Sequence, residues 1–303
     1  SFFGFVSFFP QLVAGPIERA KDLLPQFKNP RKFEYGNAVH GMRQILWGMF
    51  KKVVLADNAA VIVDSIFGNY EDASPILLLF GASMFFIQVY GDFSGYSDIA
   101  IGTARLFGFK LSVNFSSPFF SRSFREFWRR WHISLSTWFR DYLYIPLGGN
   151  KLGVFNTYRN LFIVFLITGL WHGASWNFII WGALHGMGLI LEQLLKPIKQ
   201  TVNGRFNINT ANYGYKLIYI IITFSFVSLA WVFFRANTLT DAMYIFQHMF
   251  TINSFELLET GLSDFDLSLS FYLIIFLLTI QIIERKNNLT KIIYKENTIP
   301  RWI

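Results

Sequence analysis

The 303-residue sequence contains no cysteine, which excludes disulfides, thiolate metal ligands and a cysteine nucleophile. It also lacks the motifs of several other chemistries, since no Gly-Lys-Ser/Thr phosphate loop, His-Glu-x-x-His zinc site or Gly-x-Ser-x-Gly nucleophile elbow occurs. Charge is scarce as well, because Asp, Glu, Lys and Arg make up 15% of the chain, whereas soluble domains carry about a quarter. The chemistry left open is acid–base catalysis centred on histidine.

The sequence is instead rich in apolar residues, with 53% hydrophobic and 19% aromatic residues, and many of them lie in long uncharged runs. A helix of about 20 mostly apolar residues crosses the hydrocarbon layer of a bilayer. Five runs without Asp, Glu, Lys or Arg approach or exceed that length, namely 1–17, 73–91, 160–191, 217–234 and 267–283. The run 160–191 is too long for one crossing and fits two helices joined by a tight break. These runs predict an all-α, polytopic transmembrane helical bundle embedded in a lipid bilayer.

The net charge of +8 is explained by the membrane assignment, so we expect no nucleic-acid partner. Basic residues of multi-pass proteins gather in cytoplasmic loops. They dominate 95–159, 196–216 and the segment after residue 283, whereas the loop after Arg235 is acidic. This pattern predicts that the basic segments face the cytoplasm and that the acidic loop lies on the opposite side.

The chain starts at Ser1 inside an apolar run, without a signal peptide, and stops at Ile303 after a basic segment, so we interpret it as a fragment truncated at both ends. No repeat or low-complexity segment divides it, which predicts one membrane domain over 1–303. Two segments fit neither a span nor a loop. Residues 41–67 mix apolar and charged side chains, and residues 121–147 are rich in Arg and Trp. Both predict interfacial or re-entrant helices, whose backbone at membrane depth needs a cavity or protein partners.

The segment 121–142 carries the densest set of polar and aromatic side chains, with His132 at its centre. Residues 127–138 read Phe-Trp-Arg-Arg-Trp-His-Ile-Ser-Leu-Ser-Thr-Trp. Trp and Arg of this kind also occur in interface belts, where they contact lipid headgroups. From composition alone, both a catalytic segment and an interface belt stay open.

Two further histidines, His172 and His185, lie inside the uncharged run 160–191. An ionisable group at that depth is costly to bury and is a functional candidate by default, although a neutral imidazole can also pack helices through a hydrogen bond. His172 falls at the expected break beside glycines, whereas His185 falls mid-helix. His172 is therefore the better catalytic candidate, and the glycines at 182 and 186 predict a helix-packing face.

Asp92 and Asp98 follow the run 73–91 and are candidates to orient a catalytic histidine. Helix capping and structural ion pairing explain them equally well. The remaining histidines, His40 and His248, lie in amphipathic surroundings and receive no role.

Four of these segments together resemble the bacterial membrane-bound O-acyltransferases. They are Phe-Phe-Pro-Gln-Leu-Val-Ala-Gly-Pro-Ile at 8–17, Asp-Phe-Ser-Gly-Tyr-Ser-Asp-Ile-Ala at 92–100, Phe-Trp-x-x-Trp-His-x-Ser-Leu-Ser-x-Trp-x-Arg-Asp-Tyr at 127–142 and Leu-Trp-His-Gly-x-x-Trp at 170–176. The nearest branch is that of alginate and peptidoglycan O-acetylation. Tyr-Ile-Pro-Leu-Gly-Gly-Asn at 144–150 favours this branch over the more distant teichoic-acid D-alanyl transferases.

The resemblance implies a ring of helices around a central tunnel, with His172 at its centre and His132 nearer the cytoplasmic donor side. It implies acyl transfer from a thioester donor, acetyl-CoA or an acyl carrier, with no tightly bound cofactor and no metal. It also implies a bacterial inner (cytoplasmic) membrane location and an extracytoplasmic acetyltransferase partner, of SGNH type, that modifies a polysaccharide.

On this basis we expect His172 to act as general base and His132 to bind or orient the donor. Arg129, Arg130 and Arg140 are candidates to attract a phosphate-bearing donor, although interface anchoring explains the same arginines. Three alternatives remain: D-alanyl transfer to teichoic acid, a transporter or channel, and a noncatalytic membrane scaffold.

Overall fold

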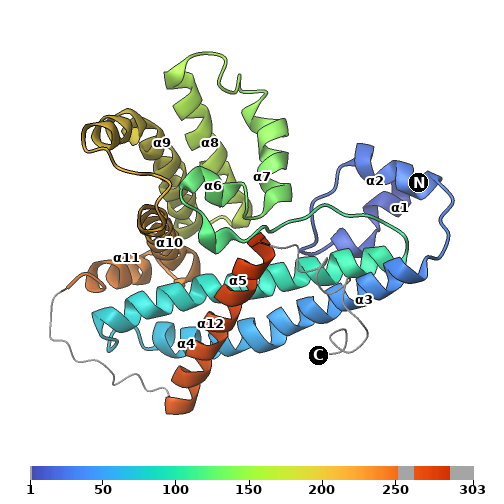
Figure 1. Ribbon diagram of the computed structural model, residues 1–303, viewed down its shortest axis with the longest axis horizontal. Helices are drawn as coiled ribbons and strands as arrows, with labels where there is room; N and C mark the ends of the chain where they lie inside the picture. Colours follow the sequence, from blue (N-terminus) through green and yellow to red (C-terminus); the bar gives the residue numbers. More distant parts are fainter. Residues whose placement is uncertain (1, 252–262, 287–303) are drawn as a thin grey trace.

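The computed structural model describes residues 2–251 and 263–286, and these residues form helices without any β-strand. In chain order the elements are α1 (Phe2–Val6), η1 (Phe9–Gln11), α2 (Ala20–Lys28), α3 (Tyr35–Phe50), η2 (Lys51–Ala56), α4 (Asp57–Gly68), α5 (Pro75–Leu106), η3 (Pro118–Phe120), α6 (Phe124–Trp128), α7 (Ile133–Phe139), η4 (Arg140–Tyr144), α8 (Val154–His172), α9 (Trp176–Arg205), α10 (Tyr213–Arg235), α11 (Leu239–His248) and α12 (Asp264–Lys286). Figure 1 shows α6 to α10 grouped on one side of the long helix α5, whereas α1 and α2 lie near the C-terminal end of that helix. The all-α fold class predicted from the sequence is confirmed.

Four of these helices, α5, α8, α9 and α10, are long and apolar enough to cross a membrane. The expected break within 160–191 is real, because α8 ends at His172 and the Ser175 side chain accepts a hydrogen bond from the backbone N–H of Asn177 as α9 begins. The run 267–283 lies in α12 but is shorter than the four spans. Within the described residues of the run 1–17, namely 2–17, the helices are the short α1 and η1.

The mixed composition of residues 41–67 predicts an interfacial or re-entrant helix, and their placement at the membrane interface stays a prediction. They form the consecutive helices α3, η2 and α4, which lie antiparallel along α5 (Figure 1). Gly41 lies against Gly102 and Gly48 against Gly95, so close that a Cβ on any of the four would approach the opposite carbonyl oxygen to 2.5–2.7 Å. The helices can bury charged residues because Lys51 forms a salt bridge with Asp98 of α5. Composition alone could not reveal this pairing.

The α8–α9 hairpin is also packed backbone to backbone through glycine. A Cβ at position 169 would lie 2.2 Å from the Phe178 carbonyl oxygen, and one at position 182 would lie 2.3 Å from that of Phe165. The small-residue packing face predicted around Gly182 is therefore present. Aromatic side chains of α5, α6, α9 and α10 fill the space beside the hairpin and form the main hydrophobic core.

Part of the charge pattern used to predict orientation lies outside the described residues, namely 252–262 of the acidic loop and 287–303 of the basic C-terminal segment. The assignment of the two membrane sides stays a prediction. The single-domain assignment over 1–303 likewise stays a prediction.

Candidate active site

His132 and His172 line the same cavity, of about 360 Å³. Its walls come from segments far apart in the sequence: the loop after η1, helix α5, the α6–α7 region, the end of α8, and helices α9 and α10. The lining residues are Ala14, Val89, Asp92, Phe93, Tyr96, Trp128, Trp131, His132, Leu135, His172, Trp181, Trp231 and Phe234. Most of these side chains are aromatic or aliphatic, so the two imidazoles lie in an apolar chamber.

His132 lies between α6 and α7 with an unusual backbone. Its φ of 43° and ψ of 54° are left-handed, a conformation that costs a residue with a Cβ about 1–3 kcal/mol. The helix predicted over 121–147 is therefore broken at this residue. The imidazole is 5% exposed and contacts Phe93 at a ring-centroid distance of 4.5 Å, while its Nδ1 has no hydrogen-bond partner among the residues that the structure describes. Burial lowers the pKa of His132, and a positive charge on His172 lowers it further, so this ring is neutral near pH 7.

His172 is the last residue of α8, at the break that the length of the run 160–191 predicts. Its ring meets Trp181 edge-on at a centroid distance of 5.2 Å and Phe234 at 5.1 Å. A Cβ at position 173 would lie 2.6 Å from the ring of Phe178, so a larger residue there would have to displace that ring. The imidazole thus lies at the end of a rigid helix, held between aromatic rings of α9 and α10.

His185 takes a different position, as its mid-helix location suggests. It is 1% exposed, and within residues 2–251 and 263–286 neither ring nitrogen has a hydrogen-bond partner. Its ring packs against Trp128 at 5.0 Å and Trp181 at 4.8 Å, two side chains that line the cavity. His185 therefore lies behind the cavity wall and does not reach the chamber.

A second, larger cavity of about 690 Å³ adjoins the first and shares Trp128 and Leu135 with it. Arg129 and Arg140 line this cavity, as do Arg125 and Lys196. Its walls come mainly from α6, α7, the first half of α8 and the second half of α9. Two of the three arginines proposed for donor binding thus lie where a cationic cavity adjoins the histidine chamber.

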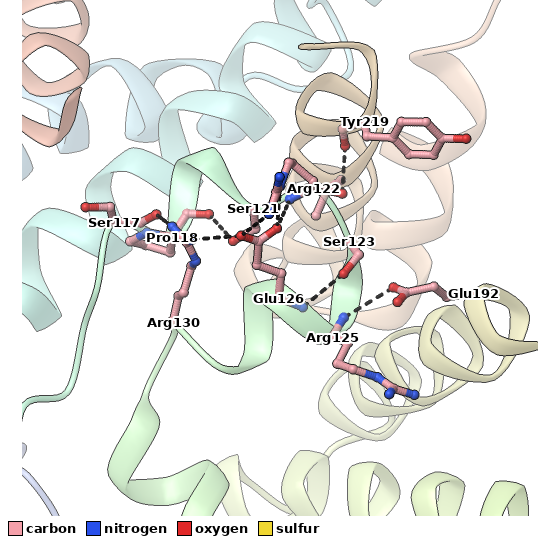
Figure 2. Close-up of polar contacts among 11 residues, drawn as sticks. Ser117, Pro118, Ser121, Arg122, Ser123, Arg125, Glu126, Arg130, Glu192 and Tyr219 are labelled. Atoms are coloured by element: carbon pink, nitrogen blue, oxygen red, sulfur yellow. Dashed lines mark hydrogen bonds and ion pairs between the residues drawn. The ribbon is translucent and has the colours of Figure 1, made fainter. Parts of the chain in front are cut away.

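Arg130, the third predicted donor residue, does not line either cavity. Its guanidinium forms an ion pair of 2.7 Å with Glu126 and donates a hydrogen bond of 3.2 Å to the Ser117 carbonyl oxygen. Figure 2 shows Glu126 between Arg130 and Arg122, which bonds the same carboxylate through Nε at 3.1 Å. Burial acts to raise the pKa of Glu126, but the hydrogen bonds from Arg122 and the charge of Arg130 outweigh it and hold the pKa below its usual value. In this structure Arg130 fixes the fold of the segment before His132.

Asp92 and Asp98, the two aspartates considered as partners for a histidine, have different surroundings in the structure. Asp92 lines the histidine cavity and forms an ion pair of 2.6 Å with Lys52. Asp98 pairs with the buried Lys51 and accepts a hydrogen bond of 2.9 Å from Gln44. Asp98 therefore joins α5 to α3 and η2, whereas Asp92 is the carboxylate that faces the chamber.

Sequence reasoning did not single out Trp231 and Phe234, which close the cavity from α10. They lie in an apolar span, where aromatic residues usually pack against lipid or neighbouring helices, so no local signal separates them from the core. Trp231 contacts Trp181 at a centroid distance of 5.5 Å and Phe234 at 4.8 Å. These contacts make α10 part of the site.

The part of the chain that forms these structural features is similar to known proteins. Residues 1–234 match MBOAT, the membrane-bound O-acyltransferase family, and this range contains the whole histidine cavity. The chain is 45% identical over 258 residues to "Probable alginate O-acetylase AlgI" of Pseudomonas putida, which covers 85% of this chain and 50% of the relative. It is 44% identical over 255 residues to the peptidoglycan O-acetyltransferase of Helicobacter pylori, covering 84% and 47%.

A more distant relative is the teichoic acid D-alanyltransferase of Streptococcus thermophilus, 32% identical over 259 residues, covering 77% of this chain and 60% of the relative. The chain thus spans about half the length of the two O-acetylation relatives it matches. With four apolar helices able to cross the bilayer and a family match over most of its residues, the chain belongs to the membrane-bound O-acyltransferase family.

Proposed function

We propose that the full-length protein is an O-acyltransferase that moves an acetyl group from a thioester donor in the cytoplasm toward a polysaccharide on the extracytoplasmic side of the membrane. One observation carries this proposal: His132 and His172, from different helical segments, line one chamber beside a cavity with cationic walls. The mainly apolar lining of this chamber disfavours bulk water, which helps to protect a thioester from hydrolysis.

In the proposed reaction His172 acts as general base. Its neutral imidazole accepts the proton of an attacking hydroxyl while the hydroxyl oxygen bonds to the thioester carbonyl carbon. The carbon–sulfur bond then breaks, and the leaving thiolate takes the proton back from the imidazolium. General acid–base catalysis of this kind contributes about 10²–10⁴ in rate.

His132 is proposed to bind or orient the donor, because it lies in the same chamber and next to the wall shared with the cationic cavity. Arg129 and Arg140 would attract the phosphates of a donor such as acetyl-CoA. Arg125 and Lys196 line the same cavity and strengthen its positive field. The donor is a substrate in this scheme, and we propose no tightly bound cofactor. A donor role for Arg130 stays a prediction, since it pairs with Glu126 here.

Acetyl is proposed as the acyl group because the relatives named for O-acetylation are 45% and 44% identical, compared with 32% for the D-alanyltransferase. The same comparison supports an alginate-like exopolysaccharide or peptidoglycan as the final acceptor. We further propose location in a bacterial cytoplasmic membrane and transfer through an extracytoplasmic partner of SGNH type.

The test uses cells that produce the full-length protein, with the ester-linked groups released from the envelope by mild base and identified. We expect acetate from the wild type and a loss of it in His172→Ala at a normal protein level. His248→Ala is the matched control, because His248 stacks on Tyr244 in α11 outside the cavity. Released D-alanine would select the D-alanyl alternative, and unchanged acetate in His172→Ala would refute the enzyme proposal in favour of a transporter or scaffold.

A further inference from the structure

Asn114, in the connector between α5 and η3, is bonded to the two residues that follow His132. It is 1% exposed. Its backbone carbonyl accepts a hydrogen bond of 3.0 Å from the N–H of Ile133. Its side-chain Oδ1 accepts two more from Ser134, one from the backbone N–H at 3.2 Å and one from Oγ at 2.9 Å. Three hydrogen bonds from one buried residue therefore fix the chain immediately after the imidazole.

The same asparagine connects this segment to the rest of the fold. Its Nδ2 donates to Ser97 Oγ of α5 at 3.2 Å, and Ser134 Oγ accepts a hydrogen bond of 3.0 Å from the N–H of Ile17. Ser97, Ser134 and Ile17 belong to three different sequence motifs, at 92–100, 127–142 and 8–17. Asn114 lies outside all three and joins them into one buried polar cluster, made of Ile17, Ser97, Asn114 and Ser134.

His132 needs such support for two reasons. Its left-handed backbone is disfavoured and persists only where surrounding contacts impose it. Its ring Nδ1 has no hydrogen-bond partner in the described part of the chain, so no hydrogen bond at that atom sets the direction of the imidazole there. Aromatic contacts with Phe93 and Trp171 restrict the orientation of the imidazole but do not fix the backbone of His132. The direction of this imidazole into the chamber therefore depends on the backbone that Asn114 holds.

We propose that Asn114 is the positioning residue for His132, acting through Ile133 and Ser134. The proposal rests on the function proposed above for its effect on rate, but its geometric content is independent of that function. Removing the Asn114 side chain should release the left-handed turn and move the imidazole relative to His172. A displacement of about 1 Å in a reacting group costs on the order of 10² in rate.

The first measurement reads the position of His132 without using activity. Diethylpyrocarbonate acylates accessible neutral imidazoles, and trypsin releases residues 131–140 as a peptide in which His132 is the sole histidine. In the full-length protein, Asn114→Ala should raise the labelling rate of His132 several-fold and leave that of His248 unchanged. Asn160→Ala is the matched control, because Asn160 is equally buried but bonds the carbonyls of Leu147 and Gly149. An unchanged labelling rate of His132 in Asn114→Ala would overturn the proposal.

The second measurement is an activity cycle with His132→Gln. Asn114→Ala should lower the acetyl-transfer rate by on the order of 10²-fold when His132 is present, and should add no further loss in the His132→Gln background. An equal loss in both backgrounds would mean a general structural role and would also overturn the proposal. Full activity of His132→Gln would instead refute the donor role of His132, and the labelling measurement alone would then decide the role of Asn114.

A milder variant covers the case in which Asn114→Ala does not fold. Ser134→Ala removes the hydroxyl that bonds both Asn114 and Ile17 but keeps the backbone bonds. We expect a smaller rise in His132 labelling in this variant, and labelling at the wild-type rate would refute the proposal.

Discussion

Replacing Gly182 with alanine should separate α8 from α9 and disturb the end of α8 that carries His172. The new Cβ would lie 2.3 Å from the Phe165 carbonyl oxygen, whereas ordinary van der Waals contact begins at 3.4 Å, so the two backbones must move apart by about 1 Å. Overpacking of this kind costs about 1–3 kcal/mol. The ring centroids of His172 and Trp181 are 5.2 Å apart across the same hairpin, so the shift should also lower the rate of acyl transfer.

The assay compares unfolding free energy and acetyl-transfer rate of the purified full-length protein. Gly204→Ala is the control, because position 204 is in the same helix and a Cβ there meets nothing within 4 Å. Alanine should stabilise that site by up to about 1 kcal/mol through helix propensity. If Gly182→Ala matched Gly204→Ala in both stability and rate, the inferred backbone contact between α8 and α9 would be wrong.

Three further substitutions test other parts of the structure. Lys51→Ala leaves Asp98 without its salt bridge and should lower the unfolding free energy by about 3–5 kcal/mol. Lys52→Ala removes two half-exposed ion pairs, with Asp57 and Asp92, and should cost less than about 1 kcal/mol for each. Chemical unfolding in detergent compares the two variants. Because hydrogen bonds from Arg122 and the charge of Arg130 lower the folded pKa of Glu126, its stabilising contribution is complete at neutral pH and is lost as the pH falls through that pKa. Glu126→Gln should therefore make unfolding less sensitive to acid below the ordinary Glu pKa of about 4.3. Arg129→Gln should raise the KM for a phosphate-bearing thioester several-fold with little change in kcat, and an unchanged KM in steady-state kinetics would remove Arg129 from the donor site.

The spans were predictable because lipid imposes a simple length rule on uncharged runs. The break between α8 and α9 was predictable too, since 160–191 is too long for one crossing and has glycine beside His172. The sequence also distinguished His172 from His185 by position, and the structure places the first in the chamber and the second behind its wall.

Other features depend on partners that are distant in sequence. The course of 41–67 along α5 follows from the pairing of Lys51 with Asp98 and from facing glycines, none of which composition can reveal. The separation of Arg130 from Arg129 follows from Glu126, which holds one arginine away from the cavity that the other lines. Asn114 has no local signal at all, because its importance lies in hydrogen bonds to residues of three other segments.

In the proposed mechanism His172 transfers protons during acyl transfer and His132 positions the donor. Single-turnover kinetics can measure both roles. Purified full-length protein is mixed with radiolabelled acetyl-CoA and the acceptor fraction, and thioester consumption and ester formation are followed for the wild type, His172→Ala and His132→Ala. We expect His172→Ala to slow ester formation by about 10²–10⁴-fold while the protein remains folded and binds the donor normally. We expect His132→Ala to weaken or misorient donor binding. Ester formation at the wild-type rate in His172→Ala would contradict the general-base role of His172.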